Sequence, residues 1–136
     1  MQDTEKVPVW LKWGVVLVGT GVAIGAFGAH ALDGVVTEAR LDTFETAVQY
    51  QTVHAMALIF GSLLAMGFPE ERWLEWAMRL LLAGILVFSG SLYLLVLLDQ
   101  GWLGAVTPFG GVILIAGYAA FLVAAFRMRR PPQRGA

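Results

Sequence analysis

The residues of this chain best suited to chemistry are two histidines and the polar side chains that lie between them. Three of these polar residues fall close together at Tyr50, Gln51 and His54. In a helix, side chains three and four positions apart are neighbours, so Tyr50 and Gln51 can both approach the imidazole of His54. Histidine titrates near neutral pH, and such a group can relay protons. It can equally serve as a hydrogen-bonded contact between helices.

Other polar residues extend this group toward the preceding histidine. A helix running back from residue 54 to residue 40 places Arg40 on the face of His54 and Glu45 on the other side. His30 ends the apolar stretch before it. We therefore expect His30 and the Tyr50–His54 face to share one hydrogen-bonded network, which Glu45 can join from the helix end. The complete candidate polar cluster is His30, Arg40, Glu45, Tyr50, Gln51 and His54.

Metal and cofactor chemistry finds little support in these residues. Two histidines on neighbouring helices can ligate haem, but His30 and His54 are predicted to lie at different depths. The chain has no cysteine, which excludes a thiolate metal site and covalent c-type haem attachment. Zinc would need a third ligand, and Glu45 points away from the His54 face. We predict no catalytic residue, no metal site and no cofactor.

Four long apolar stretches must position these side chains. They cover residues 13–31, 47–68, 77–98 and 105–126, and each has about the 20 residues that a helix needs to cross a bilayer. Hydrophobic residues make up 58% of the 136-residue chain, more than a soluble domain carries. The predicted fold is an all-α integral membrane four-helix bundle with antiparallel neighbours. A single domain covers residues 1–136, with 127–136 as a basic flexible tail.

The basic residues predict the orientation of these helices. Eight of the nine lysines and arginines fall on one side of the four predicted spans, and Arg40 is the exception. Cytoplasmic loops are rich in lysine and arginine, so both termini are predicted to be cytoplasmic. The arginines after residue 126 then anchor the chain near anionic lipid and do not indicate a nucleic-acid site.

Two features of the first span leave alternatives open. Its basic start, its apolar run and the triplet Ala29–Ala31 also fit a secretory signal peptide, whose cleavage would leave three spans. Within the span, Gly21, Gly25 and Gly28 recur at helical spacing. Small residues in such a row let two helices approach closely, so we interpret them as helix-packing residues. A substrate path along their groove is the alternative.

Two sequence blocks are similar to those of a known family. The first reads G-A-F-G-A-H-A-L from Gly25 to Leu32, and the second reads F-E-T-A-V-Q-Y-Q-x-x-H-A-x-A-L from Phe44 to Leu58. At this separation the chain resembles the small membrane proteins of the domain of unknown function 423 (DUF423), and the transmembrane protein 256 group is similar. This resemblance implies a multi-pass protein of the bacterial inner membrane. It implies no biochemical activity for the matching residues.

The sequence favours a non-enzymatic structural or accessory role in the inner membrane. A translocating protein normally shows polar residues on several facing spans, whereas the third and fourth spans offer only a few, which are Ser89, Ser91, Tyr93 and Tyr118. A small proton, ion or solute translocator using His54 is the first alternative. A haem-, quinone- or lipid-binding module is the second. The expected partners are the lipid bilayer and either another membrane protein or a second copy of the chain, with no nucleic acid.

Overall fold

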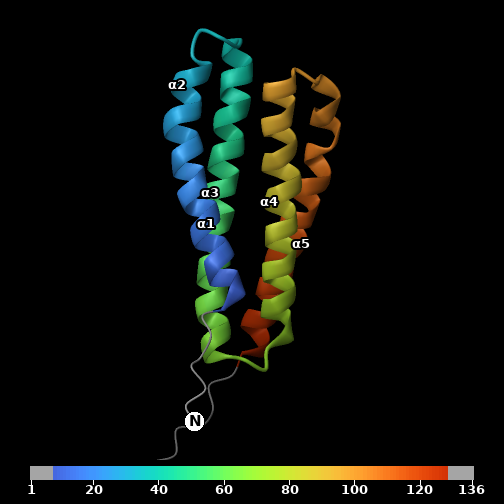
Figure 1. Ribbon diagram of the computed structural model, residues 1–136. Helices are drawn as coiled ribbons and strands as arrows, with labels where there is room; N and C mark the ends of the chain where they lie inside the picture. The colour runs from blue at the N-terminus through green and yellow to red at the C-terminus, as the bar shows by residue number, and fades with distance from the viewer. Residues whose placement is uncertain (1–7, 129–136) are drawn as a thin grey trace, which may run out of the picture.

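The computed structural model describes residues 8–128, and every regular element in this part of the chain is helical (Figure 1). The predicted basic tail lies outside the described residues from residue 129 onward, while Arg127 still belongs to the last helix. The elements in chain order are α1 (Val9–Ala23), the π-helical turn η1 (Ile24–Gly28), α2 (Ala29–Leu32), α3 (Glu38–Gly67), α4 (Arg72–Leu98), the 3-10 turn η2 (Gly101–Ala105) and α5 (Thr107–Arg127).

Four of these helical stretches are long and apolar enough to cross a membrane, which confirms the prediction of four helices of membrane-spanning length and hydropathy. They are Val9–Leu32, Glu38–Gly67, Arg72–Leu98 and Gly101–Arg127. The largest difference from the predicted bounds is at α3, which begins nine residues before the expected residue 47. Thr37 caps it by accepting a hydrogen bond from the Arg40 amide at 3.3 Å, and no glycine or proline lies between Thr37 and Ala47. Hydropathy marks where charge ends, whereas backbone bonding decides where the helix begins.

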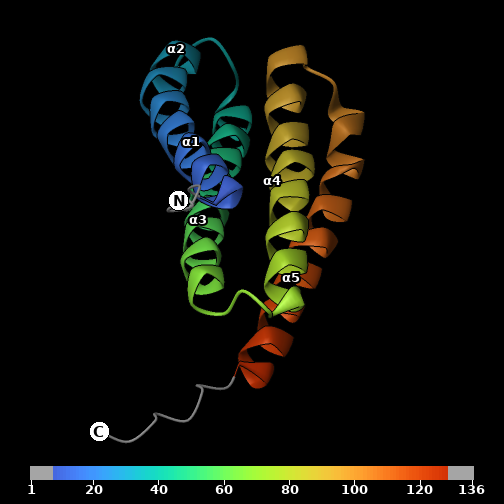
Figure 2. The ribbon, with the colours of Figure 1, turned by 60° about the horizontal axis from the view of Figure 1, so that its bottom comes forward.

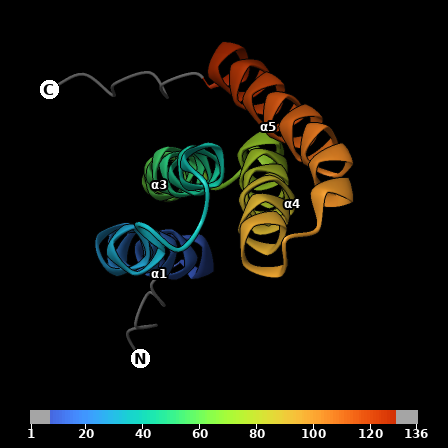
Figure 3. The ribbon, with the colours of Figure 1, turned by 90° about the horizontal axis from the view of Figure 1, so that it is seen from above.

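The helices pack in chain order, α3 against α1, α4 against α3 and α5 against α4. Seen from above, α3 and α4 lie in the middle, and α1 and α5 lie on opposite flanks (Figure 3). Figure 2 shows α1 beside α3 and α5 beside α4. As a result α4 buries the largest share of its apolar stretch and α1 the smallest. Much of the surface of α1 and α5 is therefore left for contact with lipid or with another protein.

Glycines let α5 approach α4 closely. A Cβ added at Gly110 would overlap the backbone of Phe88, and one added at Gly84 would lie 2.6 Å from the Leu114 side chain. Because hydrocarbon offers no hydrophobic driving force between helices, such close packing carries much of their association. Large buried side chains fill the centre between the helices, among them Leu58, Leu74, Met78, Leu81 and Leu114.

The connections lie at the two ends of the helices. Residues 33–37 and η2 lie at one end, which we call the loop end (Figure 1). The connection 68–71, the start of α1 and the close of α5 lie toward the other end, which we call the terminal end (Figure 1). Because α3 runs from the loop end to the terminal end, its polar residues lie at different levels between the two.

Candidate functional site

Gln51 is buried at a junction of three helices. Its side-chain amide nitrogen donates to the Leu17 carbonyl at 2.8 Å and to the Thr20 hydroxyl at 3.0 Å, both on α1. Its amide oxygen accepts a hydrogen bond from the Tyr93 hydroxyl of α4 at 2.8 Å. Gln51 is only 4% exposed. One glutamine thus ties α3 to both of its neighbours, and its amide oxygen and nitrogen are both bonded.

A second buried bond supports the same junction. The Ser89 hydroxyl of α4 donates to the Ala47 carbonyl of α3 at 2.8 Å, and Ser89 is 1% exposed. Nearby, the Tyr93 ring meets Phe44 edge-on, with the ring centroids 5.5 Å apart. We call Thr20, Ala47, Gln51, Ser89 and Tyr93 the closed junction.

The three glycines proposed to pack helices face α3 in one row. A Cβ added at Gly21 would lie 2.7 Å from the Thr52 hydroxyl, and one added at Gly25 would lie 3.0 Å from a Val48 methyl carbon. At Gly28 it would overlap the ring of Phe44. The π-helical turn η1 begins three residues after Gly21 and includes the other two glycines. At these three positions α1 has no side chain of its own, so the side chains of α3 can approach its backbone and α1 can close over Gln51.

His54 lies on a different side of α3, where it meets α5. Its Nδ1 atom and the Tyr118 hydroxyl are 2.7 Å apart. Tyr50 stacks on Phe88 of α4, with centroids 4.1 Å apart and ring planes 17° from parallel, and it meets His54 edge-on at 5.4 Å. These rings are only half-buried, and Tyr50 and His54 line a surface hollow together with Gln49 and Val53. We call Gln49, Tyr50, His54 and Tyr118 the open cleft.

An apolar groove lies between α3 and α5, and Tyr118 of the open cleft belongs to its lining. It has a volume of about 370 Å³ and extends past Tyr118 toward the terminal end. The α3 side contributes Ala57, Phe60 and Leu64, and the α5 side contributes Phe121, Leu122 and Ala125. Nothing in this lining is charged, so the groove suits a hydrocarbon chain.

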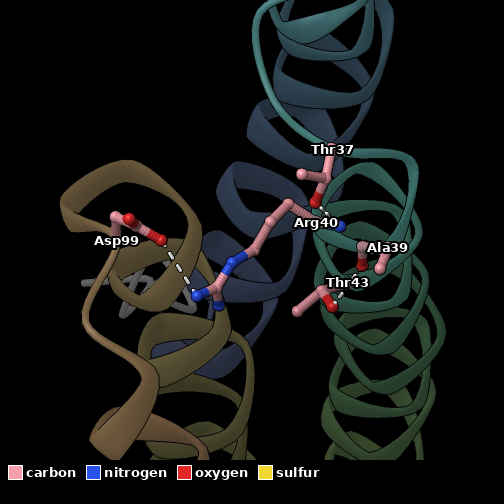
Figure 4. A network of polar contacts seen from close by, with 5 residues as sticks. All are labelled: Thr37, Ala39, Arg40, Thr43 and Asp99. Carbon is pink, nitrogen blue, oxygen red and sulfur yellow. Dashed lines mark hydrogen bonds and ion pairs between the residues drawn. The ribbon is translucent and has the colours of Figure 1, made fainter.

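Arg40 makes its contact at the loop end, outside both regions. Its guanidinium donates to the Asp99 carboxylate at 2.9 Å and so joins the start of α3 to the end of α4 (Figure 4). Asp99 adopts a left-handed conformation with φ of 51°, which aspartate tolerates better than most residues and which ends α4. Its side chain is 85% exposed, so water screens this ion pair.

The predicted single network is wrong. His30 and Glu45 are exposed, and neither side chain makes a hydrogen bond to any of residues 8–128. Gln51 and His54 also point to different neighbours, because two side chains three positions apart on a helix point about 60° apart around its axis. That rotation turns Gln51 toward α1 and α4 and His54 toward α5. Within the described part of the chain, no three histidine, aspartate or glutamate side chains are grouped as metal ligands.

Charged side chains at the terminal end make contacts that sequence reasoning missed. The Trp10 indole donates to the Glu75 carboxylate at 2.7 Å, and the same carboxylate accepts from Arg79 at 2.9 Å. The spacing of Glu75 and Arg79 by four residues was the available signal for that pair. The bond from Trp10 depends on how α1 lies beside α4, which no local pattern encodes. It ties the beginning of α1 to the third span.

Comparison with known proteins gives a consistent result. Residues 24–111 match the family model described as "Protein of unknown function (DUF423)". The UPF0382 membrane protein SAB0533 of Staphylococcus aureus is 42% identical over 78% of this chain and 85% of its own. The UPF0382 inner membrane protein YgdD of Escherichia coli is 39% identical over 80% and 82%, and YwdK of Bacillus subtilis is 38% identical over 88% and 97%. No solved structure matches the chain.

Proposed function

We propose that this chain, which belongs to the DUF423 family of membrane proteins, is a non-enzymatic structural or accessory component of the bacterial inner membrane. The observation that carries the proposal is the use of the closed junction. Gln51, the residue with the largest buried polar side chain in the described part, has both its amide atoms in bonds between helices. A side chain occupied in this way supports packing and is not free to act on a substrate.

Two buried serines support the same interpretation. Ser89 bonds the α3 backbone, and the Ser91 hydroxyl lies 2.7 Å from that of Thr107 at the start of α5. In a membrane such contacts contribute about 0.6–2 kcal/mol each. Buried polar groups thus link each helix to the next along the chain, as expected of a protein whose task is to present a stable surface.

We further propose that neighbouring helices are antiparallel and that both termini are cytoplasmic. The order of the α1–α3 contacts supports the first point, because Gly21, Gly25 and Gly28 face Thr52, Val48 and Phe44 in descending order. The distribution of basic residues supports the second point. Among the described residues, those toward the terminal end are Lys12, Arg72, Arg79 and Arg127, and the loop end has Arg40.

Single cysteines test this orientation directly, since the chain has none of its own. Val35→Cys places a thiol in the exposed connection at the loop end, and Glu70→Cys places one in the connection at the terminal end. A maleimide that cannot cross membranes should label Val35→Cys in intact cells. It should label Glu70→Cys only after the membrane is permeabilised. The reverse pattern would overturn the proposed orientation.

Reconstituted vesicles test the non-enzymatic role against translocation. The purified full chain in liposomes with an internal pH dye should dissipate a proton gradient no faster than empty liposomes. A faster flux that disappears in His54→Gln would favour the translocation alternative, because glutamine can hydrogen-bond but does not titrate near neutral pH. A flux unchanged in His54→Gln would place the path elsewhere and also contradict the proposal.

A further inference from the structure

The open cleft places polar side chains where a membrane protein usually buries them. His54 lies near the middle of α3 and Tyr118 near the middle of α5, and both are partly exposed. Polar groups at this depth are costly and normally face partners inside the protein. Apart from the bond between His54 and Tyr118, no side-chain hydrogen bond within residues 8–128 involves Gln49, Tyr50 or the second nitrogen of His54. These groups are available to a molecule that enters from the bilayer.

The rings of Tyr50 and His54 form a wall of this cleft, and the rings of Phe88 and Tyr118 lie against them. Phe88 and Tyr50 stack, Tyr50 meets His54, and His54 meets Tyr118 with centroids 5.5 Å apart. Aromatic faces and edges favour contact with another flat ring. Hydrogen-bonding atoms lie on the same rings, so a flat ring with polar substituents fits this wall better than an aliphatic chain does.

The charge of the surroundings restricts what such a ring can be. The spans that form the cleft carry no charged residue between Glu45 and Gly67, between Leu80 and Leu98, or between Thr107 and Phe126. A phospholipid headgroup is charged and stays at the membrane surface, well above His54. A ligand for this cleft must therefore be uncharged and must reside within the hydrocarbon. A neutral ring with hydrogen-bond acceptors meets both conditions, and the adjoining apolar groove accommodates a long tail.

We propose that the open cleft binds the ring of an isoprenoid quinone and that the groove between α3 and α5 holds the first part of its tail. If the Tyr118 hydroxyl donates to Nδ1 of His54, the neutral imidazole carries its proton on Nε2. That N–H, together with the Tyr50 hydroxyl, can donate to the quinone carbonyl oxygens. Tyr118 is then a positioning residue, because it sets which nitrogen of His54 is the donor. The inference goes beyond the accessory role and requires only that the chain lies in a membrane.

Nitrogen NMR on histidine side chains gives a test with an internal control. The chain has two histidines, and His30 is exposed in α2, away from the cleft. The full chain is labelled with ¹⁵N-histidine, placed in lipid nanodiscs and titrated with decylubiquinone. We expect a saturable shift of the His54 resonances and none for His30. Equal, non-saturating shifts of both histidines would show mere partitioning of the probe and overturn the proposal.

Matched variants sharpen the same titration. Tyr118→Phe should weaken decylubiquinone binding about fivefold, since His54 loses the bond that orients it. Tyr93→Phe removes a hydroxyl from the closed junction and should leave the affinity unchanged. Ala57→Phe should fill the groove and also weaken binding. Unchanged affinity in both Tyr118→Phe and Ala57→Phe would refute the site. A His54 signal that follows the protein-to-lipid ratio and ignores the quinone would show that a second copy covers the cleft.

Discussion

Gln51 and His54 are three residues apart on α3 and have opposite surroundings. Gln51 is buried and bonds to two other helices, whereas His54 is half-buried and bonds to one. Both are polar residues in the same span, so residue type does not explain the difference. The number of neighbours that close around each side chain does. A polar group enclosed by two helices holds the fold together, and one beside a single neighbour keeps atoms available to a ligand.

Glycine placement decides which side of α3 is closed. Gly21 lies directly over the closed junction, where an added Cβ would be 3.4 Å from the Gln51 amide nitrogen. On α5, Gly110 and Gly117 face Phe88 and Leu81 of α4. These glycines bring α5 close to α4. Beside His54, α5 therefore lies farther from α3 than from α4. The cleft is therefore a consequence of which helix α5 approaches most closely.

The largest expected effect comes from separating α1 and α3. Gly28→Leu should lower the free energy of unfolding by about 2 kcal/mol or more, because its Cβ alone overlaps Phe44. Gly19→Leu is the matched control on the same helix, since no atom lies within 4 Å of its added Cβ, and it should change stability by less than about 0.5 kcal/mol. Unfolding by SDS in mixed micelles measures both. Equal effects would mean that the glycine row does not close the junction.

A leucine at each of the two contrasted positions should have unequal effects. Gln51→Leu should cost about 1–2 kcal/mol, because it removes the bonds to Leu17, Thr20 and Tyr93. His54→Leu should cost less than about 0.5 kcal/mol, because half-exposed leucine is compatible with lipid and only one bond is lost. The same SDS titration applies. A larger loss for His54→Leu would reverse the roles of the two regions.

Removing single hydroxyls gives a smaller version of the comparison. Tyr93→Phe leaves the amide oxygen of Gln51 without its partner and should cost about 1 kcal/mol. Tyr118→Phe should cost less, about 0.5 kcal/mol, because its partner His54 is accessible from the cleft. Thermal unfolding in detergent is precise enough to rank the two. Identical midpoints would indicate that enclosure does not strengthen the bond.

The smallest effect is expected at the loop end. Arg40→Gln removes the ion pair with Asp99, whose carboxylate is largely exposed, and should cost about 0.5 kcal/mol or less. High salt should reduce the difference further, because it screens exposed charges. Thermal unfolding at low and high salt checks this. A loss as large as that of Gln51→Leu would show that the exposed pair, and not the enclosed amide, holds α3 to α4.

The amino-acid sequence by itself determined the class of this protein and much of its fold. Four apolar stretches, each about as long as the hydrocarbon core of a bilayer is thick, predict a membrane protein, and they lie where the structure has four helices long and apolar enough to span. The two blocks around His30 and His54 were enough to identify the family, which the comparisons confirm. These features are local in sequence, because hydropathy and motif spacing do not depend on how the helices pack.

Tertiary structure alone decided which neighbour each polar residue meets. Helical periodicity put Arg40, Gln51 and His54 on one broad face, but they bond to three different places. Thr20 and Glu75 became partners of distant residues without any local sign of it. Rotations of about 60° around a helix axis separate these outcomes, and close approach at glycines sets which helix lies on each side. Side-chain spacing within one helix contains no information about either, because both are properties of pairs of helices.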